Sequence, residues 1–135
     1  MERILFKGYE SKVMTAEAAA LLIENNDVVG SSGFTKAGDS KSVLPAFAKR
    51  AENEDVAITL ITGASLGYTT DADLAANNAL NRRMPFMADP ALRKSINDYK
   101  LKYIDQHLSE TIEQLICGHI APVDTAFKFS RCTRL

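Results

Sequence analysis

Residues 27–41 read DVVGSSGFTKAGDSK, and this stretch holds the pattern from which the fold is predicted. Val28 and Val29 begin a short apolar run that favours a strand ending near Ser31. Three glycines and four hydroxyl-bearing residues lie within the stretch, as in a turn that joins a strand to a helix. Backbone N–H groups near the start of that helix carry partial positive charge, so they favour an anion or a polarised carbonyl.

Helix and strand patterns alternate on both sides of this stretch. A helix is expected after its N-cap Thr15, another over 42–51, and a buried strand over 56–61. Further along, the sequence predicts helices over 72–80, from Pro90 with Asp89 as cap, and over 111–117 with Ser109 as cap and Gly118 as stop, and strands over 84–87, 101–105 and 122–129. The alternation predicts an α/β fold with an open, mainly parallel sheet of about five strands and helices on both faces.

The composition is that of a single globular domain of 135 residues, with 46% hydrophobic and 24% charged residues. A net charge of −1 gives no basic field for nucleic acid, so no nucleic-acid partner is expected. No apolar run approaches the roughly 20 residues of a membrane span. The start, MERILFKGYE, lacks the apolar core of a signal peptide, so a cytoplasmic location and no membrane association are expected. The cysteines, Cys117 and Cys132, form no metal spacing and are interpreted as free thiols, Cys117 on a packed helix.

In a parallel sheet, ligands bind beyond the carboxyl ends of the strands. The loops expected there are GSSGFTKAG (30–38), TGASLG (62–67), MADP (87–90) and DQHLS (105–109). The first two are rich in glycine and hydroxyl groups, and we expect them to lie at the same edge. Together they favour a pocket more strongly than either loop alone, since glycines by themselves also serve simply to make tight turns.

The first loop does not match the nucleotide-binding motifs. Gly30, Gly33 and Gly38 have the wrong spacing for G-x-G-x-x-G. A P-loop requires a lysine where this chain has Asp39, whose carboxylate would repel phosphate. A small carboxylate or a thioester carbonyl suits the loop better than a triphosphate. Its neutral hydrogen-bond donors would be the hydroxyl groups of Ser31, Ser32 and Thr35.

A serine hydrolase is a further alternative. Gly63, Ser65 and Gly67 have the G-x-S-x-G spacing of a nucleophile elbow. Such an elbow needs a histidine and an acid, and His107 and His119 are the only histidines.

Two pairs of adjacent basic residues, Arg82-Arg83 and Arg93-Lys94, are typical of solvated surfaces, or of a pocket rim that steers an anion.

Several segments in order resemble one family. They are VVGSSGFTKAG, ITLITGAS, RRMPFMADPALRKSIN, YIDQHLS and GHIAPVDTA. The chain resembles, over about residues 10–126, the N-terminal region of the acetyl-CoA hydrolase/transferase family, the class I CoA-transferases that include succinyl-CoA:acetate CoA-transferases. We therefore expect a CoA-transferase N-terminal-like domain over 1–126, truncated, followed by a tail over 127–135 that is foreign to the family.

The resemblance implies an activity to which this chain contributes one part. Family members transfer CoA between carboxylic acids through a glutamyl-CoA thioester, with a coenzyme A thioester as substrate and no permanently bound cofactor. The nucleophilic glutamate lies in the C-terminal domain, which this chain lacks, so the chain alone is expected to be inactive. Its own glutamates are interpreted as helix-face or terminal residues.

No spacing of His, Cys, Asp or Glu in the sequence suggests a metal site. The resemblance implies the residues that line the substrate pocket. They are Gly33, Phe34, Thr35, Gly63, Ala64, Ser65 and Ala88. Ala88 stands where the family often has a threonine, which implies a different or more apolar acid. The expected partners are an acyl-CoA, a small carboxylate, and either the missing C-terminal domain or a second copy bound through the exposed face. A non-catalytic binding or assembly module remains the alternative function.

Overall fold

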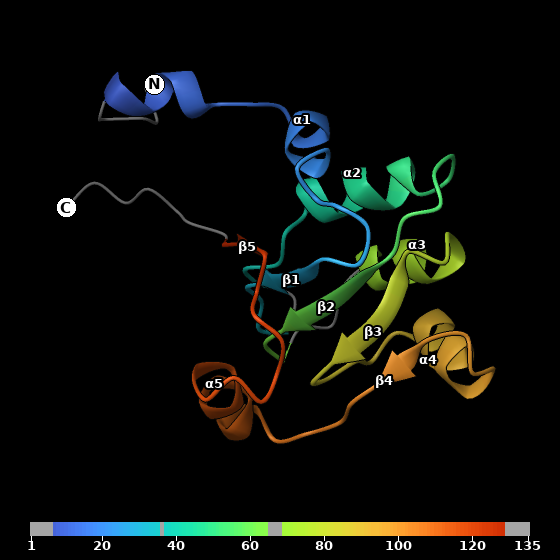
Figure 1. Cartoon of the computed structure of the whole chain (residues 1–135). Coiled ribbons are helices and arrows are strands. Elements are labelled where there is room, and N and C mark those ends of the chain that lie inside the picture. The colour runs from blue at the N-terminus through green and yellow to red at the C-terminus, as the bar shows by residue number, and fades with distance from the viewer. Residues whose placement is uncertain (1–6, 36, 65–68, 129–135) are drawn as a thin grey trace.

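The computed structural model describes residues 7–35, 37–64 and 69–128, and within them a parallel sheet with helices on both faces (Figure 1). The elements in chain order are η1 Lys7–Lys12, α1 Ala16–Ala20, β1 Val28–Ser31, α2 Val43–Arg50, β2 Ile58–Thr62, α3 Thr70–Ala76, β3 Leu80–Met84, α4 Pro90–Asn97, β4 Lys102–Tyr103, α5 Leu108–Ile116 and β5 Thr125–Phe127. The predicted α/β alternation is therefore confirmed.

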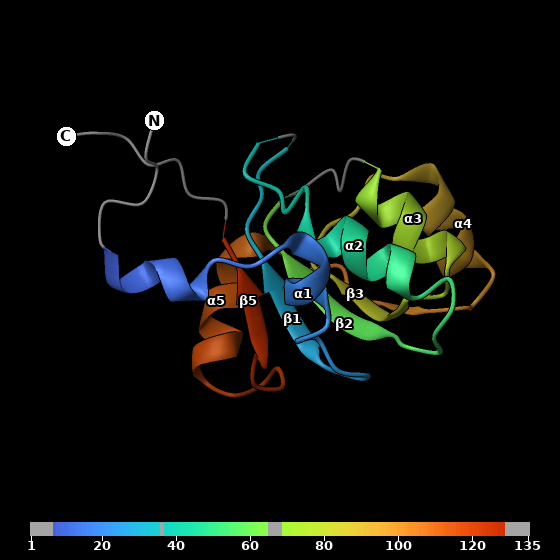
Figure 2. The same cartoon turned by 90° about the horizontal axis from the view of Figure 1, so that it is seen from above.

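The five strands lie in the order β4-β3-β2-β1-β5, and every neighbouring pair is parallel. From β1 to β4 the chain moves stepwise in one direction, and it then crosses back to place β5 on the far side of β1. Right-handed crossovers in these opposite directions place the connecting helices on opposite faces of the sheet. Figures 1 and 2 show α1, α2, α3 and α4 gathered along one side, with α5 apart from them.

Two apolar clusters show that both faces are used. The larger joins the first four helices to one face, and its most deeply buried members include Phe47, Leu60, Leu74 and Leu92. The smaller lies on the opposite face, where Val28, Ile61, Met84 and Ile120 are buried and Leu115 of α5 packs against them. Within the described residues α5 thus covers only part of its face, since Thr59 and Arg82 on the amino-terminal half of that face stay partly exposed.

Local sequence signals explain where two of the helices begin. The Thr15 hydroxyl oxygen accepts a hydrogen bond from the Ala18 N–H at 3.1 Å, and Asp89 accepts one from the Leu92 N–H at 2.9 Å. Pro90 stands at the first position of α4, where its missing N–H costs nothing. These caps were expected from the sequence and are confirmed.

Other expectations were wrong in detail. The strand expected over 84–87 lies at Leu80–Met84, because Arg83 is buried and paired while Pro85 follows the strand. The N-cap of α5 is His107 in place of Ser109, since the ring Nδ1 accepts from the Ser109 N–H at 3.4 Å. Cys117 is exposed instead of packed. The proposed tail lies mostly outside the described residues, so its boundary stays a prediction.

Candidate functional site

The two glycine loops lie side by side at the carboxyl edge of the sheet. The Thr35 N–H donates to the Ala64 carbonyl at 2.7 Å, which ties the loop after β1 to the loop after β2. The backbone also passes closely at the glycines, because a Cβ on Gly63 would meet the Gly33 carbonyl oxygen at 2.4 Å. The expectation that these loops share one edge is confirmed. Glycine at position 63 is required by this approach.

The first loop is closed by a pair of backbone hydrogen bonds and carries two exposed side chains. Phe34 and Ala37 exchange backbone hydrogen bonds, of 2.8 Å from the Phe34 N–H and 3.0 Å from the Ala37 N–H. Thr35 has a φ of 53° and Gly38 a φ of 75°, both in the left-handed region. Phe34 and Thr35 are exposed, so the loop presents an aromatic ring and a hydroxyl-bearing side chain to the outside of this edge.

Hydroxyl groups at the ends of the strands hold the loops in shape. Ser32 donates to the Gly38 carbonyl at 2.6 Å, and Ser31 donates to the Ser32 carbonyl at 3.2 Å. Thr62 donates likewise to the Gly63 carbonyl at 2.8 Å. Because a hydroxyl has one proton to donate, Ser31 and Ser32 do not offer it to a ligand in this geometry. Of the three donors considered from sequence, Thr35 is the one whose hydroxyl has no such backbone acceptor among the described residues.

A buried polar cluster lies beneath this edge. Arg83 spans Asp71 with two contacts of 3.3 Å, and its Nη1 donates to the Met84 carbonyl at 2.7 Å. The Arg83 and Asp71 side chains are 0% and 2% exposed. Asp39, at the end of the first loop, is also buried and lines the same cavity of about 10 Å³, which has room for roughly one water molecule.

This cluster corrects two expectations. Arg83 belongs to the interior and not to a solvated charge pair, because Asp71 on α3 supplies its counter-charge. Asp39 was expected to argue against a phosphate loop by its charge, and the structure places it in the interior, where it lines the cavity together with Ser31, Thr62 and Thr70. Arg83 of β3, Asp71 of α3 and Asp39 of the first loop line one cavity, so the first loop meets the core at this point.

Not every expected pocket residue is placed. Ser65 lies outside the described residues, and so does Gly67 of the elbow spacing. Ala88 is half-buried in the loop between β3 and α4, at the same edge. The hydrogen bonds among the described residues join the first two loops to each other and leave Ala88 apart from them. His107 caps α5, and its Nδ1 lies 2.7 Å from the Ser109 hydroxyl.

Sequence reasoning missed Asp71 and Arg83, although a usable signal existed. Arg83 directly precedes Met84-Pro85, which is typical of a strand end, and Asp71 in the preceding helix supplies an acid that can pair with it. Among residues 7–35, 37–64 and 69–128, no cluster of three or more His, Cys, Asp or Glu is arranged to hold a metal ion. The helices of the same ranges include none with the length and apolar character that crossing a membrane requires.

Comparison with known proteins places these loops in a family context. The model of the acetyl-CoA hydrolase/transferase N-terminal domain matches residues 2–128. A succinyl-CoA:acetate CoA-transferase of Clostridium kluyveri is 40% identical over 127 residues, covering 93% of this chain and 24% of the relative. A propanoyl-CoA:succinate CoA transferase of Escherichia coli is 38% identical over 118 residues, with 84% and 24% covered.

Fungal relatives are more distant in sequence. An acetyl-CoA hydrolase of Candida glabrata is 32% identical over 122 residues, covering 87% of this chain and 23% of the relative. The chain therefore spans about a quarter of the length of the curated relatives that it matches.

Proposed function

Because the chain belongs to the acetyl-CoA hydrolase/transferase family through its N-terminal domain, we propose that it supplies one wall of a pocket for an acyl-CoA and a small carboxylate. The wall consists of the two joined glycine loops, Gly33–Thr35 and Gly63–Ala64, with Ser65 and Ala88 as further members. The contact between Thr35 and Ala64 carries the proposal, since it brings two segments far apart in sequence to one edge.

The geometry of this wall suits a carbonyl or carboxylate group. Close backbone approach at Gly63 leaves no side chain between the two loops. The first loop and the buried cluster beneath it hold the backbone before any ligand arrives, which lowers the ordering cost of binding. Ala88 offers a methyl group where a threonine would offer a hydroxyl, so the proposed acid is more apolar than one that needs a hydrogen bond there.

The reaction needs a nucleophile, and we propose that this chain does not supply it. Transfer through a glutamyl-CoA thioester requires a carboxylate in a sheltered place, with its orientation controlled. Every glutamate within the described residues is exposed. We therefore propose that the nucleophile comes from the part of the protein that its relatives carry beyond this domain, and that the chain alone does not turn over substrate.

Binding can be tested on the chain as it stands, by titrating isotope-labelled protein with acetate, butyrate and acetyl-CoA while recording amide shifts. We expect the shifts to concentrate at Gly33, Thr35, Gly63 and Ala64. Butyrate should bind more tightly than acetate. Shifts that avoid both loops would contradict the proposed pocket. A Thr35→Val variant, which keeps the side-chain shape, should weaken carboxylate binding while its amide spectrum elsewhere stays unchanged.

A second candidate function is that of an assembly module, and α5 favours it. Leu108, Ile112 and Ile116 recur every four residues along this helix and are 37%, 66% and 81% exposed. Such a stripe is larger than the isolated apolar residues of an ordinary surface and marks a face that another polypeptide covers. The proposed cover is the remaining part of the family's polypeptide, with self-association as the outcome when that part is absent.

The serine-hydrolase reading keeps one feature, the spacing around Ser65. His107 is occupied at the start of α5 with Ser109, so it offers no preformed base for that serine. A fluorophosphonate probe decides this reading directly. Labelling of Ser65 would support it, and an unlabelled chain would remove it.

A further inference from the structure

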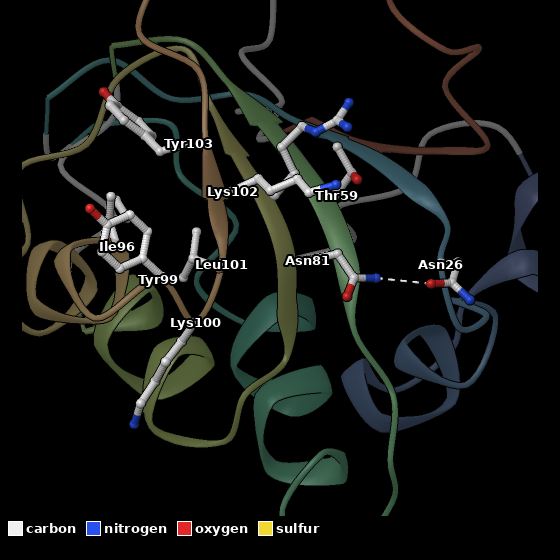
Figure 3. A pocket seen from close by; sticks show the side chains of 10 residues that line it. Asn26, Thr59, Asn81, Ile96, Tyr99, Lys100, Leu101, Lys102 and Tyr103 are labelled. Carbon is white, nitrogen blue, oxygen red and sulfur yellow. Dashed lines mark hydrogen bonds between the residues drawn. The ribbon is translucent and has the colours of Figure 1, made fainter.

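An open groove lies away from the loop edge, on the half of the sheet face that α5 leaves uncovered. It encloses about 790 Å³, within the size range of small-molecule sites. Figure 3 shows Tyr99, Ile96 and Leu101 along one side and the bonded pair Asn81 and Asn26 at the other. Neither the family match nor the loop pocket assigns a role to this groove.

Two cationic side chains and a threonine form the floor of the groove. Thr59, Arg82 and Lys102 are register partners on three neighbouring strands, so their side chains leave the same face of the sheet. Figure 3 shows the Lys102 side chain crossing this face toward Thr59. Like charges on adjacent strands destabilise a sheet unless something neutralises them. Arg82 and Lys102 therefore create a demand for an anion.

The groove does not meet this demand from its own side chains. No acidic residue occurs among its described lining residues. Asp98 is close in sequence, but its carboxylate is bonded to Lys94 at 2.5 Å, and this hydrogen bond lowers the pKa of Asp98. Among the described residues no ion pair forms with either Arg82 or Lys102. A bound anion would supply the missing negative charge.

Tyr99 adds an aromatic surface at the wall of the groove. It follows α4 with a φ of 57°, and two hydrogen bonds, from Tyr99 to Ile96 and from Lys100 to Ser95, close a Schellman motif around it. Glycine is the usual residue at this left-handed position, and a bulky side chain there is strained. Tyr99 is 95% exposed, so no packing within the described fold compensates. Strain without packing points to a role in binding.

We propose that this groove binds a nucleotide, with the base stacked on Tyr99 and the phosphates held by Arg82 and Lys102. Tyr99 and Lys102 are three residues apart, so their Cα atoms are at most about 10 Å apart. This distance is comparable with that from a base to its phosphates. Base stacking on an exposed aromatic ring and charge-assisted contacts to phosphate are the general means of holding such a ligand. The site is separate from the proposed loop pocket and does not depend on it.

A nucleotide can reach this groove from two sources, as a free nucleotide or as the nucleotide part of a coenzyme A thioester. Titration calorimetry of the full chain at low salt with ADP, coenzyme A, pantetheine and pyrophosphate separates them. We expect ADP to bind more tightly than pyrophosphate, and pantetheine not to bind. Coenzyme A tighter than ADP identifies the thioester as source, and ADP equal or tighter identifies a free nucleotide. Absence of ADP and coenzyme A binding overturns the proposal.

Variants test each contact. Arg82→Gln and Lys102→Gln should each weaken ADP about tenfold, while Arg93→Gln, an exposed arginine on α4, should leave the dissociation constant within about twofold. Tyr99→Gly should lose ADP binding yet raise the melting temperature, because glycine relieves the left-handed strain. A Tyr99→Gly chain that binds ADP as the native chain does would contradict the stacking role, whatever its stability.

Discussion

The carbonyl oxygen of Gly33 stands 2.4 Å from the point that a Cβ atom on Gly63 would occupy. The two loops that carry these glycines are joined in addition by the hydrogen bond from Thr35 to Ala64. Residue 63 can therefore hold no side chain unless one backbone moves. This relationship makes the shared loop edge a property of the sequence that can be tested by single substitutions.

Substitution Gly63→Ala should separate the loops and cost about 2 to 4 kcal/mol of unfolding free energy, because the clash is with backbone. Two matched substitutions provide the scale. For Gly30→Ala the nearest atom to the new Cβ is in the Val123 side chain at 3.4 Å, so stability should change little, whereas Gly118→Ala, with a φ of 73° in open space, should cost about 1 kcal/mol from strain alone. Urea unfolding measures all three. A Gly63→Ala chain as stable as Gly30→Ala would contradict the close approach.

Replacing one member of the buried pair Asp71 and Arg83 should destabilise the fold much more than replacing both. Asp71→Asn leaves a guanidinium without its counter-charge in the interior, which should cost about 3 to 5 kcal/mol. The double variant Asp71→Leu with Arg83→Met should recover much of that loss. The exposed pair Lys94–Asp98 serves as control, and Asp98→Asn should leave the urea midpoint unchanged. An equally small effect of Asp71→Asn would place the pair at the surface.

The apolar stripe of α5 should make the chain self-associate. Light scattering coupled to size exclusion should show oligomers that grow with protein concentration, and Ile112→Glu should abolish them. Leu21→Glu is the matched control, since Leu21, the C-cap of α1, is 65% exposed and Ile112 of α5 is 66% exposed. A native chain that stays monomeric at high concentration, or dissociation by Leu21→Glu alone, would contradict the assignment to α5.

Tyr103 should titrate above the ordinary range of tyrosine. Burial raises its pKa, and the Asp105 carboxylate raises it further. Since the native state then holds this proton more tightly than the unfolded state, its contribution to stability is present below the ordinary tyrosine pKa and falls as pH rises past it. Ring resonances followed by NMR should show a lower pKa for Tyr103 in Asp105→Asn and no change in Asp98→Asn. An unchanged value in Asp105→Asn would remove the carboxylate as a cause.

Local signals explain why much of the fold was predictable. Thr15, Asp89 and Pro90 act within a few residues of their own positions, and the alternation of helices and strands needs only the order of apolar runs. The strand at Leu80–Met84 was misplaced because its two arginines look like loop residues in sequence. Arg83 is made compatible with the interior by Asp71, a partner on another element that periodicity does not reveal.

The candidate site was predictable to the level of which loops meet, because parallel strands end at one edge. The roles of single groups were not. Ser32 was expected to face a ligand, yet its hydroxyl bonds to Gly38 six residues later, which only the loop geometry determines. The groove beside Tyr99 escaped notice for the same reason, since Thr59, Arg82 and Lys102 come together only through strand register.

The central claim is that this chain contributes a pocket wall and lacks the nucleophile. The most direct measurement is CoA transfer from acetyl-CoA to succinate by the purified native chain, with the Clostridium kluyveri relative assayed beside it as the positive control. We expect turnover by the relative and none by the chain, even while the loop amides respond to carboxylate. Turnover by the chain alone, abolished when one of its own glutamates is changed to glutamine, would contradict the account.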